Sequence, residues 1–332
     1  MVWPEVEAKI SDHPWPGLGT KVDPHHLTRA KAGMVRDGLL TSTTAATRGG
    51  RRVSVWHRPV EKGTARAVTD ASARKRLLHA RYLSWASGSK TGGEGAVGPG
   101  LEGVVHASLL AAAPYGYRLF NPAGEVRSLL GAPVPGGSLD NGAVLTRLDP
   151  ETLTPDGQYI VVVEVKNLRQ WIYPRTQELH QLLDKAARLQ VAEPRRRFVP
   201  VLVCRKAHYL TNVMAQQVGF YVIQTHRQYV RPFVAETDEG RRYLSELNSE
   251  LSFDLTPEAG PVNPMVEHFR TPIQRVADRT AERWTAVAGP MASTLGRLRD
   301  DALTYDERAA YMDELAMTAA AALGEHPGWH GP

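Results

Sequence analysis

The sequence predicts an α/β fold: a mixed central sheet flanked by helices, preceded by a basic α+β domain and followed by a helical region. Three observations indicate this. Helical and strand patterns alternate between residues 101 and 225, the Gly- and Ser-rich stretch SGSKTGGEGAVGPG (87–100) precedes them, and helical periodicity continues from Met265 to the end. We therefore expect three domains, at residues 1–90, 91–235 and 236–332.

The elements of the middle region follow in a definite order. LEGVVHASLLAAA (101–113) has apolar residues at helical spacing, and the apolar run of residues 159–167 is typical of a central strand. The full series is a helix at 101–113, strands at 117–120, 138–148 and 159–167, a helix at 173–190, a strand at 197–204, a helix at 210–219 and a strand at 220–225. This order, αβββαβαβ, predicts a mixed sheet with helices beside it.

Composition narrows the class of protein. The 332 residues include one cysteine, Cys204, which excludes a disulfide framework within the chain and fits a reducing cytoplasm. No stretch resembles a signal peptide or a membrane span, so we expect a cytoplasmic protein without a membrane partner. Residues 1–100 hold 16 Lys and Arg against 8 Asp and Glu, whereas the whole chain carries only +5. A basic end favours a polyanion such as nucleic acid, and a solvated basic surface is the alternative.

An acid and a base stand at the end of the most apolar strand. Glu164 and Lys166 are two residues apart, so they emerge on the same face. If this strand forms a hairpin with residues 138–148 around residue 153, Asp140 lies opposite residue 166 and Glu164 opposite residue 142. Opposed Cβ atoms lie ~4.5–5.5 Å apart, so the three side chains should cluster. Asp156 lies in the turn, roughly 25 Å from Glu164, and cannot share the site.

Two carboxylates beside a lysine suit phosphodiester hydrolysis. Carboxylate oxygens are hard ligands of the kind that Mg²⁺ binds while keeping several waters. The lysine could orient an attacking water or stabilise the charge that develops on the phosphate. The alternative is a buried Lys–Glu pair, or a strand end at which both side chains reach solvent.

Residues 101–225 resemble the PD-(D/E)XK nuclease superfamily, whose fold is restriction-endonuclease-like. The resemblance depends on Asp140 in LDNG, on Glu164 and Lys166 in VVVEVKN and on the amphipathic helix from residue 173, and it is especially similar to bacterial restriction-type and nuclease-related-domain proteins. It implies that Asp140, Glu164 and the backbone carbonyl of Val165 bind Mg²⁺, with Mn²⁺ as a substitute, and that Lys166 is the catalytic lysine. The sequence departs from the family in having Leu139 where the motif has proline.

Two further residues enter through the resemblance. Many members carry a glutamate in the first core helix, and Glu102 fits because it is nearly in line with Leu109 on a helix. Glu102 is therefore a further catalytic residue and metal ligand, unless it is only an acid favoured near a helix N-terminus. Some relatives use a glutamine after the lysine, which points to Gln177 as a catalytic residue, with Gln181 beside it. A solvated polar helix surface is the alternative for both.

The N-terminal part is predicted to contact nucleic acid. A helix at residues 23–40 followed by a basic hairpin at TRGGRRVSVWHRP (47–59) resembles the end of a winged-helix domain. A helix at residues 70–87 would extend the basic surface. The predicted phosphate contacts are Arg48, Arg51, Arg52, Arg74, Lys75 and Arg76. The alternative is a small basic domain that packs on the nuclease.

The C-terminal part carries an apolar stripe of Met265, Phe269, Ile273 and Val276, typical of a core or of a homodimer interface. Together these features predict an Mg²⁺-dependent endonuclease that cleaves DNA in restriction or phage defence, with RNA as the alternative substrate. A second hypothesis is a catalytically silent nucleic-acid-binding or interaction module with the same fold.

Overall fold

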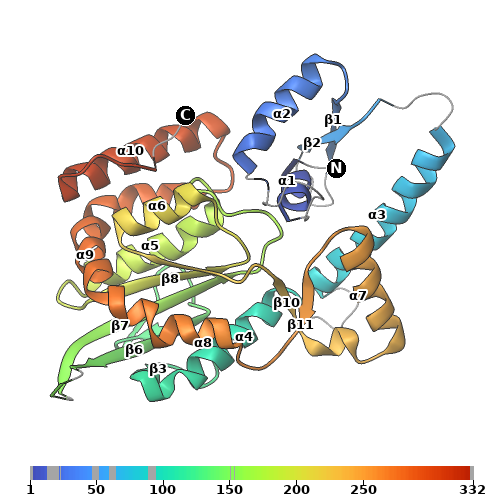
Figure 1. Ribbon diagram of the computed structural model, residues 1–332. Helices are drawn as coiled ribbons and strands as arrows, with labels where there is room; N and C mark the ends of the chain where they lie inside the picture. Colours follow the sequence, from blue (N-terminus) through green and yellow to red (C-terminus); the bar gives the residue numbers. More distant parts are fainter. Residues whose placement is uncertain are drawn as a thin grey trace. The chain divides into compact units, whose positions relative to one another are not determined.

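The chain folds into two compact units (Figure 1). The computed structural model describes residues 3–12, 22, 24–46, 52–59, 65–88, 95–149, 151–152 and 154–329. Unit 1 comprises Met1–Val97, Arg169–Trp171 and Pro232–Pro257, and unit 2 comprises Gly98–Leu168, Ile172–Arg231 and Glu258–Pro332. Each unit combines segments from separate parts of the sequence. This division therefore does not test the three expected domain boundaries, which stay a prediction.

A five-stranded sheet forms the centre of unit 2. Its strands are β3 (Tyr117–Leu119), β6 (Asn141–Leu148), β7 (Pro155–Lys166), β8 (Phe198–Cys204) and β9 (Tyr221–Gln224), in the spatial order β3-β6-β7-β8-β9. The pairs β3–β6 and β6–β7 are antiparallel, whereas β7–β8 and β8–β9 are parallel. The sheet is therefore mixed, and the predicted α/β class is confirmed.

Helices cover both faces of this sheet (Figure 1). One face carries α5 (Gln177–Ala192), α6 (Tyr209–Val218) and much of α9 (Pro272–Leu298), and α10 (Tyr305–Leu323) packs on α9. The other face carries α4 (Gly98–Ala111), α8 (Asn263–Arg270) and the start of α9. The apolar run of β7 serves both sides. Ile160 and Val162 pack in the hydrophobic core on the side of the sheet that carries α5, and Val161 and Val163 pack in the core on the side that carries α4.

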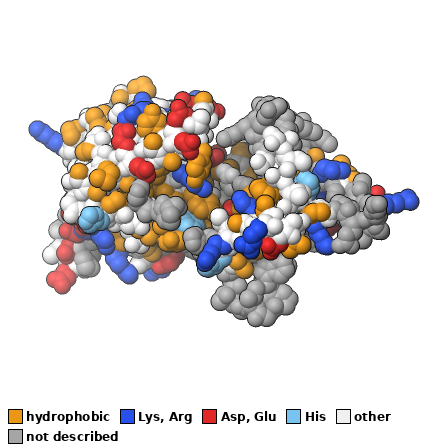
Figure 2. All heavy atoms as spheres, turned by 90° about the horizontal axis from the view of Figure 1, so that it is seen from above, with side chains coloured by type: hydrophobic (Ala, Val, Ile, Leu, Met, Phe, Trp, Pro, Cys, Tyr) orange, Lys and Arg blue, Asp and Glu red, His pale blue; other side chains and the backbone are white. Residues whose placement is uncertain are grey.

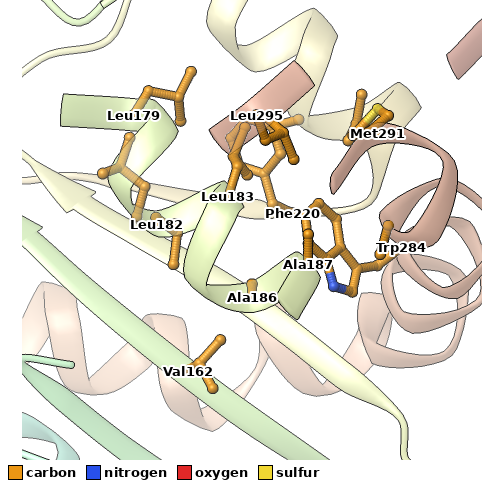
Figure 3. Packing of buried hydrophobic residues seen from close by; sticks show 14 of the residues in the cluster. Val162, Leu179, Leu182, Leu183, Ala186, Ala187, Phe220, Trp284, Met291 and Leu295 are labelled. Carbon is orange, nitrogen blue, oxygen red and sulfur yellow. The ribbon is translucent and has the colours of Figure 1, made fainter. Parts of the chain in front are cut away.

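The core on the α5 side explains why this helix forms where it does. Leu179, Leu182, Leu183 and Ala186 are fully buried, as their helical spacing predicts. In Figure 3 these side chains lie on the part of α5 that packs against Val162 of the sheet and against neighbouring helices. Burial of such side chains stabilises the fold by roughly 1.5–3 kcal/mol each relative to exposure.

Smaller elements complete unit 2. A two-stranded ribbon, β4 (Ser128–Leu129) with β5 (Ala132–Pro133), lies between β3 and β6 in the sequence, and β10 (Gln228–Val230) follows β9. A 3-10 helix, η1 (Ala113–Tyr115), follows α4. The C-terminal stripe is part of the core of this unit, since Met265, Phe269 and Ile273 are buried, while Val276 is only partly buried and Ala277 takes its place. A homodimer through the C-terminal helices stays a prediction.

The described part of unit 1 consists mainly of helices and the hairpin of β1 and β2. Its elements are α1 (Trp3–Asp12), α2 (Pro24–Arg36), β1 (Thr41–Ala46), β2 (Arg52–His57), α3 (Ala65–Ser87), η2 (Pro232–Ala235), α7 (Asp238–Glu250) and β11 (Leu255–Pro257). The predicted hairpin at residues 47–59 has the wrong boundary, because its first strand is the preceding segment TSTTAA. Among the described helices of both units, none combines the length and apolarity needed to span a membrane.

Candidate active site

The hairpin of β6 and β7 determines which residues meet at the predicted site. Gly142 lies opposite Val162, so the predicted register, with residue 142 opposite Glu164, is wrong by two residues. The paired residues of the two strands are centred on residue 152, as Gly142 opposite Val162 requires, and not on residue 153; moving the centre by one residue shifts the register by two. A shift of two residues leaves every side chain on its own face, and the predicted cluster is therefore preserved.

Asp140 lies in the bend directly before β6, and its side chain reaches β7. Its Oδ2 accepts a hydrogen bond from the backbone N–H of Val165 at 2.6 Å. Since Val165 lies between Glu164 and Lys166, this bond holds the Asp140 carboxylate at the point of β7 from which both side chains emerge. Asp156, near the start of β7, lies at the opposite end of this strand, as expected.

Glu164 is held between two lysines. Its side chain is 3% exposed, and Lys166 Nζ lies 2.9 Å from its Oε1. Lys185 of α5, which sequence reasoning missed, lies 2.9 Å from Oε2 and 3.1 Å from Oε1. A buried carboxylate requires such partners to offset its lost hydration. The sequence signal that could have revealed Lys185 is the run LLDKAA (182–187), which places an acid and a base between apolar residues of a helix. In the structure every residue of this run is buried.

The loop before β6 is fastened to α5 and to the end of α9. Lys185 Nζ donates to the carbonyl of Ser138 at 2.6 Å, so one ammonium group joins this loop to Glu164. Arg299 bonds the buried carboxylate of Asp184 at 2.8 Å and the carbonyl of Gly136 at 3.1 Å. Gly136 has a φ of +78°, and a Cβ there would meet the Arg299 guanidinium. These contacts fix the position from which the next residues enter the site.

The carboxylates of the site repel one another. Burial raises the pKa of Asp140 to about 7, and the charge of Glu164 adds to this, while the Val165 N–H and Lys166 oppose it. Burial also raises the pKa of Glu102, which Lys166 lowers and Glu164 raises. The structure therefore brings Glu102 into electrostatic contact with the other acids. Clusters of carboxylates whose pKa values are shifted are typical of functional sites.

The other predicted catalytic residue lies elsewhere. Gln177 is at the start of α5, and its amide donates to the carbonyl of Arg299 at 2.7 Å. It precedes Lys185 by eight residues, about 12 Å along a helix. A residue that sequence reasoning did not consider is His106, one turn after Glu102 on α4. Its Nδ1 lies 3.0 Å from Oδ1 of Asn141, which directly follows Asp140 in the chain.

The chemistry of these donors fits a hard divalent cation. Asp140, Glu164 and Glu102 supply carboxylate oxygens, and Mg²⁺ prefers oxygen ligands. A cation between them would offset the charge of Glu164, which adds to the effect of burial in raising the pKa of Asp140. Within the described part of the chain, no group of three or more His, Cys, Asp or Glu side chains is already arranged to hold a metal. Glu164 is engaged by lysines instead, so a cation would compete with Lys166 for it.

The predicted phosphate contacts of unit 1 are only partly described. Arg48 and Arg51 lie outside the described residues, and so does the side chain of Arg52, at the start of β2. Arg74 pairs with Glu250 of α7, with Nε 2.9 Å from Oε2. The next two residues of α3, a lysine and an arginine, are exposed. They are therefore better placed than Arg74 to bind phosphate.

Basic and acidic groups are mixed on the surface. Figure 2 shows Lys and Arg side chains interspersed with Asp and Glu over the coloured part of the face in view. A field of a single sign, which would steer a polyanion from a distance, is not visible among the side chains drawn in colour there.

Comparison of the chain with protein-family models, with curated proteins and with solved structures found no match. A function for this chain must therefore be inferred from the residues and geometry of each unit.

Proposed function

We propose that this chain is a metal-dependent endonuclease that hydrolyses phosphodiester bonds of DNA in the cytoplasm, with a restriction-endonuclease-like core in unit 2. One observation carries the proposal: Asp140, Glu164 and Lys166 converge at the carboxyl end of the central strand β7. The element order α4, β3, β6, β7, α5, β8, α6, β9 agrees with the αβββαβαβ order of such a core. The carboxyl ends of parallel strands are also where α/β proteins bind their ligands.

The residues divide into metal ligands and a charge-stabilising lysine. Asp140, Glu164 and the carbonyl of Val165 would hold Mg²⁺ or Mn²⁺, with Glu102 as a further oxygen donor. A bound Mg²⁺ supplies Lewis-acid polarisation of a phosphate oxygen. Lys166 would stabilise the negative charge that grows on the phosphoryl group in the transition state.

Lys166 and Lys185 would have different tasks. The Lys166 side chain is 16% exposed and that of Lys185 is 8% exposed, so Lys166 is the lysine that a substrate can reach. Lys185 has two fixed partners, Glu164 and the carbonyl of Ser138. It would act by positioning these groups, without touching the substrate.

One observation also favours the second hypothesis, a catalytically silent binding module. Glu164 is already neutralised by two lysines, as in a buried ion cluster that only stabilises the fold. The two hypotheses differ in whether the cluster performs chemistry.

A cleavage assay separates them. Purified protein is incubated with supercoiled plasmid, linear DNA and RNA, each with Mg²⁺, Mn²⁺ or EDTA. We expect metal-dependent cleavage of DNA, and Lys166→Ala should reduce the rate by at least ~10²–10³. Asp140→Ala should abolish cleavage together with Mn²⁺ binding in calorimetry.

Asp156→Ala is the matched control, because this aspartate lies at the other end of the same hairpin and pairs with Arg147. It should leave cleavage and metal binding intact. Cleavage by Lys166→Ala at the wild-type rate would place the active site elsewhere. A wild type that cuts none of the substrates with either metal would support the binding module.

A further inference from the structure

Five planar side chains contact one another in series on unit 2. The guanidinium carbon of Arg175 lies 5.2 Å from the ring centroid of Tyr305 and 6.0 Å from that of Tyr173. Tyr173 stacks on His208 at 4.8 Å with an interplanar angle of 26°, and His208 contacts Tyr209 at 4.6 Å. We refer to this row of Tyr305, Arg175, Tyr173, His208 and Tyr209 as the aromatic ladder.

The aromatic ladder lies at the same edge of the sheet as the candidate active site. Beyond the carboxyl ends of β7 and β8, Ile172 and Ala207 form a parallel bridge that continues their pairing. Tyr173 and His208 follow these two residues directly, which brings their rings together. Ile172 is six residues after Lys166, so the two Cα atoms lie within about 20 Å of each other.

The aromatic residues at both ends of the ladder are largely exposed. Tyr305 is 69% exposed and Tyr209 is 52% exposed, whereas His208 between them is buried. The inner members hold the outer ones in place, because Arg175 also donates a hydrogen bond of 2.8 Å to the Tyr305 hydroxyl. Exposed, orientationally fixed aromatic rings beside a guanidinium form a surface suited to planar partners with negative charge.

Nucleobases in a single strand are such partners. Each base has a π face that stacks on an aromatic ring, and its phosphate can pair with a guanidinium, as in proteins that bind single strands without sequence preference. A duplex buries these faces in its own stack. A surface of exposed aromatic rings would therefore favour unpaired over paired nucleotides.

We propose that the aromatic ladder binds unpaired bases of a single-stranded nucleic acid, one on Tyr209 and one on Tyr305, with Arg175 at a phosphate of the strand that runs between them. As a statement about the substrate, this rests on the proposed nuclease function. It implies that the active site of unit 2 receives a strand with unpaired nucleotides beside the scissile bond.

Binding is tested with the full chain in EDTA, which prevents metal-dependent cleavage during the titration. Fluorescence anisotropy measures the affinity for a short labelled oligothymidylate, for an abasic strand of the same length and for a duplex. We expect the oligothymidylate to bind more tightly than the other two. Tyr209→Ala and Tyr305→Ala should each weaken its binding about 5- to 150-fold, the range for loss of one base–aromatic stack.

Conservative variants distinguish the ring from the hydroxyl. Tyr209→Phe and Tyr305→Phe keep the stacking face, so both should bind like wild type, although the second loses the hydrogen bond from Arg175. Tyr115→Ala is the matched control, because Tyr115 is also partly exposed and stacked by an arginine, Arg270 at 5.3 Å, but precedes β3 at the opposite end of the sheet. It should not change the affinity.

The outcomes separate this inference from the nuclease proposal. Three outcomes would each overturn the proposal that the ladder binds unpaired bases: equal binding of the abasic strand and the oligothymidylate, unchanged affinity of both alanine variants, or no binding by the wild type. If wild type nevertheless cleaves DNA, the nuclease proposal stands without it. Ladder-dependent binding without cleavage of any substrate would support the ladder and refute the nuclease.

Discussion

Replacing Lys185 by Met should destabilise the protein far more than the same change at Lys166. Both lysines bond the carboxylate of Glu164, which is almost entirely buried. Lys185 also donates to the carbonyl of Ser138, so its loss leaves two acceptors without this donor. Methionine approximates the length of the lysine stem, and the comparison therefore isolates the ammonium group.

The size of the two effects follows from these contacts. Removing one partner of a buried ion pair typically costs ~3–5 kcal/mol, because a buried charge is left uncompensated. Lys166 still neutralises Glu164 in the Lys185→Met variant, so we expect a loss near the lower end, about 3 kcal/mol. Lys166→Met leaves Glu164 with its more buried partner, and should cost about 1 kcal/mol.

Urea unfolding monitored by circular dichroism measures both losses. The double variant Glu164→Gln/Lys185→Met completes a cycle, and it should be more stable than the sum of the single losses implies, by at least ~1 kcal/mol. Equal losses for Lys166→Met and Lys185→Met, or a larger loss for Lys166→Met, would refute the assignment of Lys185 as the structural lysine. Additive single losses would show that Lys185 does not depend on Glu164.

Two further predictions concern pH and salt. Burial lowers the pKa of His180 in the folded protein to about 3, whereas the pKa of histidine in the unfolded chain is ~6.5, so the unfolded chain binds this proton more readily. The neutral His180 therefore contributes stability above pH ~6.5, and this contribution is lost as the pH falls toward 3. The full loss is on the order of 5 kcal/mol. Urea unfolding at pH 7 and pH 4 should therefore show a weaker pH dependence for His180→Gln than for wild type, and equal dependence would contradict this. In unit 1, Lys75→Ala and Arg76→Ala should each lower the slope of log K for DNA against log salt by ~0.9, whereas Arg74→Ala should lower it less because Glu250 already neutralises Arg74. A full decrease for Arg74→Ala would show that this ion pair opens on DNA.

The sheet of unit 2 could be predicted because local chemistry decides most of its elements. An apolar run buried on both faces defines β7, and Gly219, with a φ of +92°, ends α6 where the pattern places its stop. The register of β6 and β7 could not be predicted to the residue, because the stretch DPETLTPDG (149–157) is dense in turn formers and no residue in it marks residue 152 as the centre of the pairing. The segment TSTTAA has no apolar alternation, so β1 is visible only through its pairing with β2.

The residues of the candidate site that are close together in the sequence could be predicted, and Lys185 could not. Glu164 and Lys166 are two residues apart on one strand, and their common face follows from the geometry of any strand. Lys185 comes from another element, and only burial makes it matter: on a solvent-exposed helix face the same lysine would be an ordinary surface charge. Because α5 is buried over the whole run LLDKAA, its charged residues must find partners inside, and Lys185 finds Glu164 and the Ser138 carbonyl. A cluster with one accessible and one inaccessible lysine can therefore keep its shape if the accessible lysine leaves Glu164 for a phosphate, as the proposed nuclease function requires.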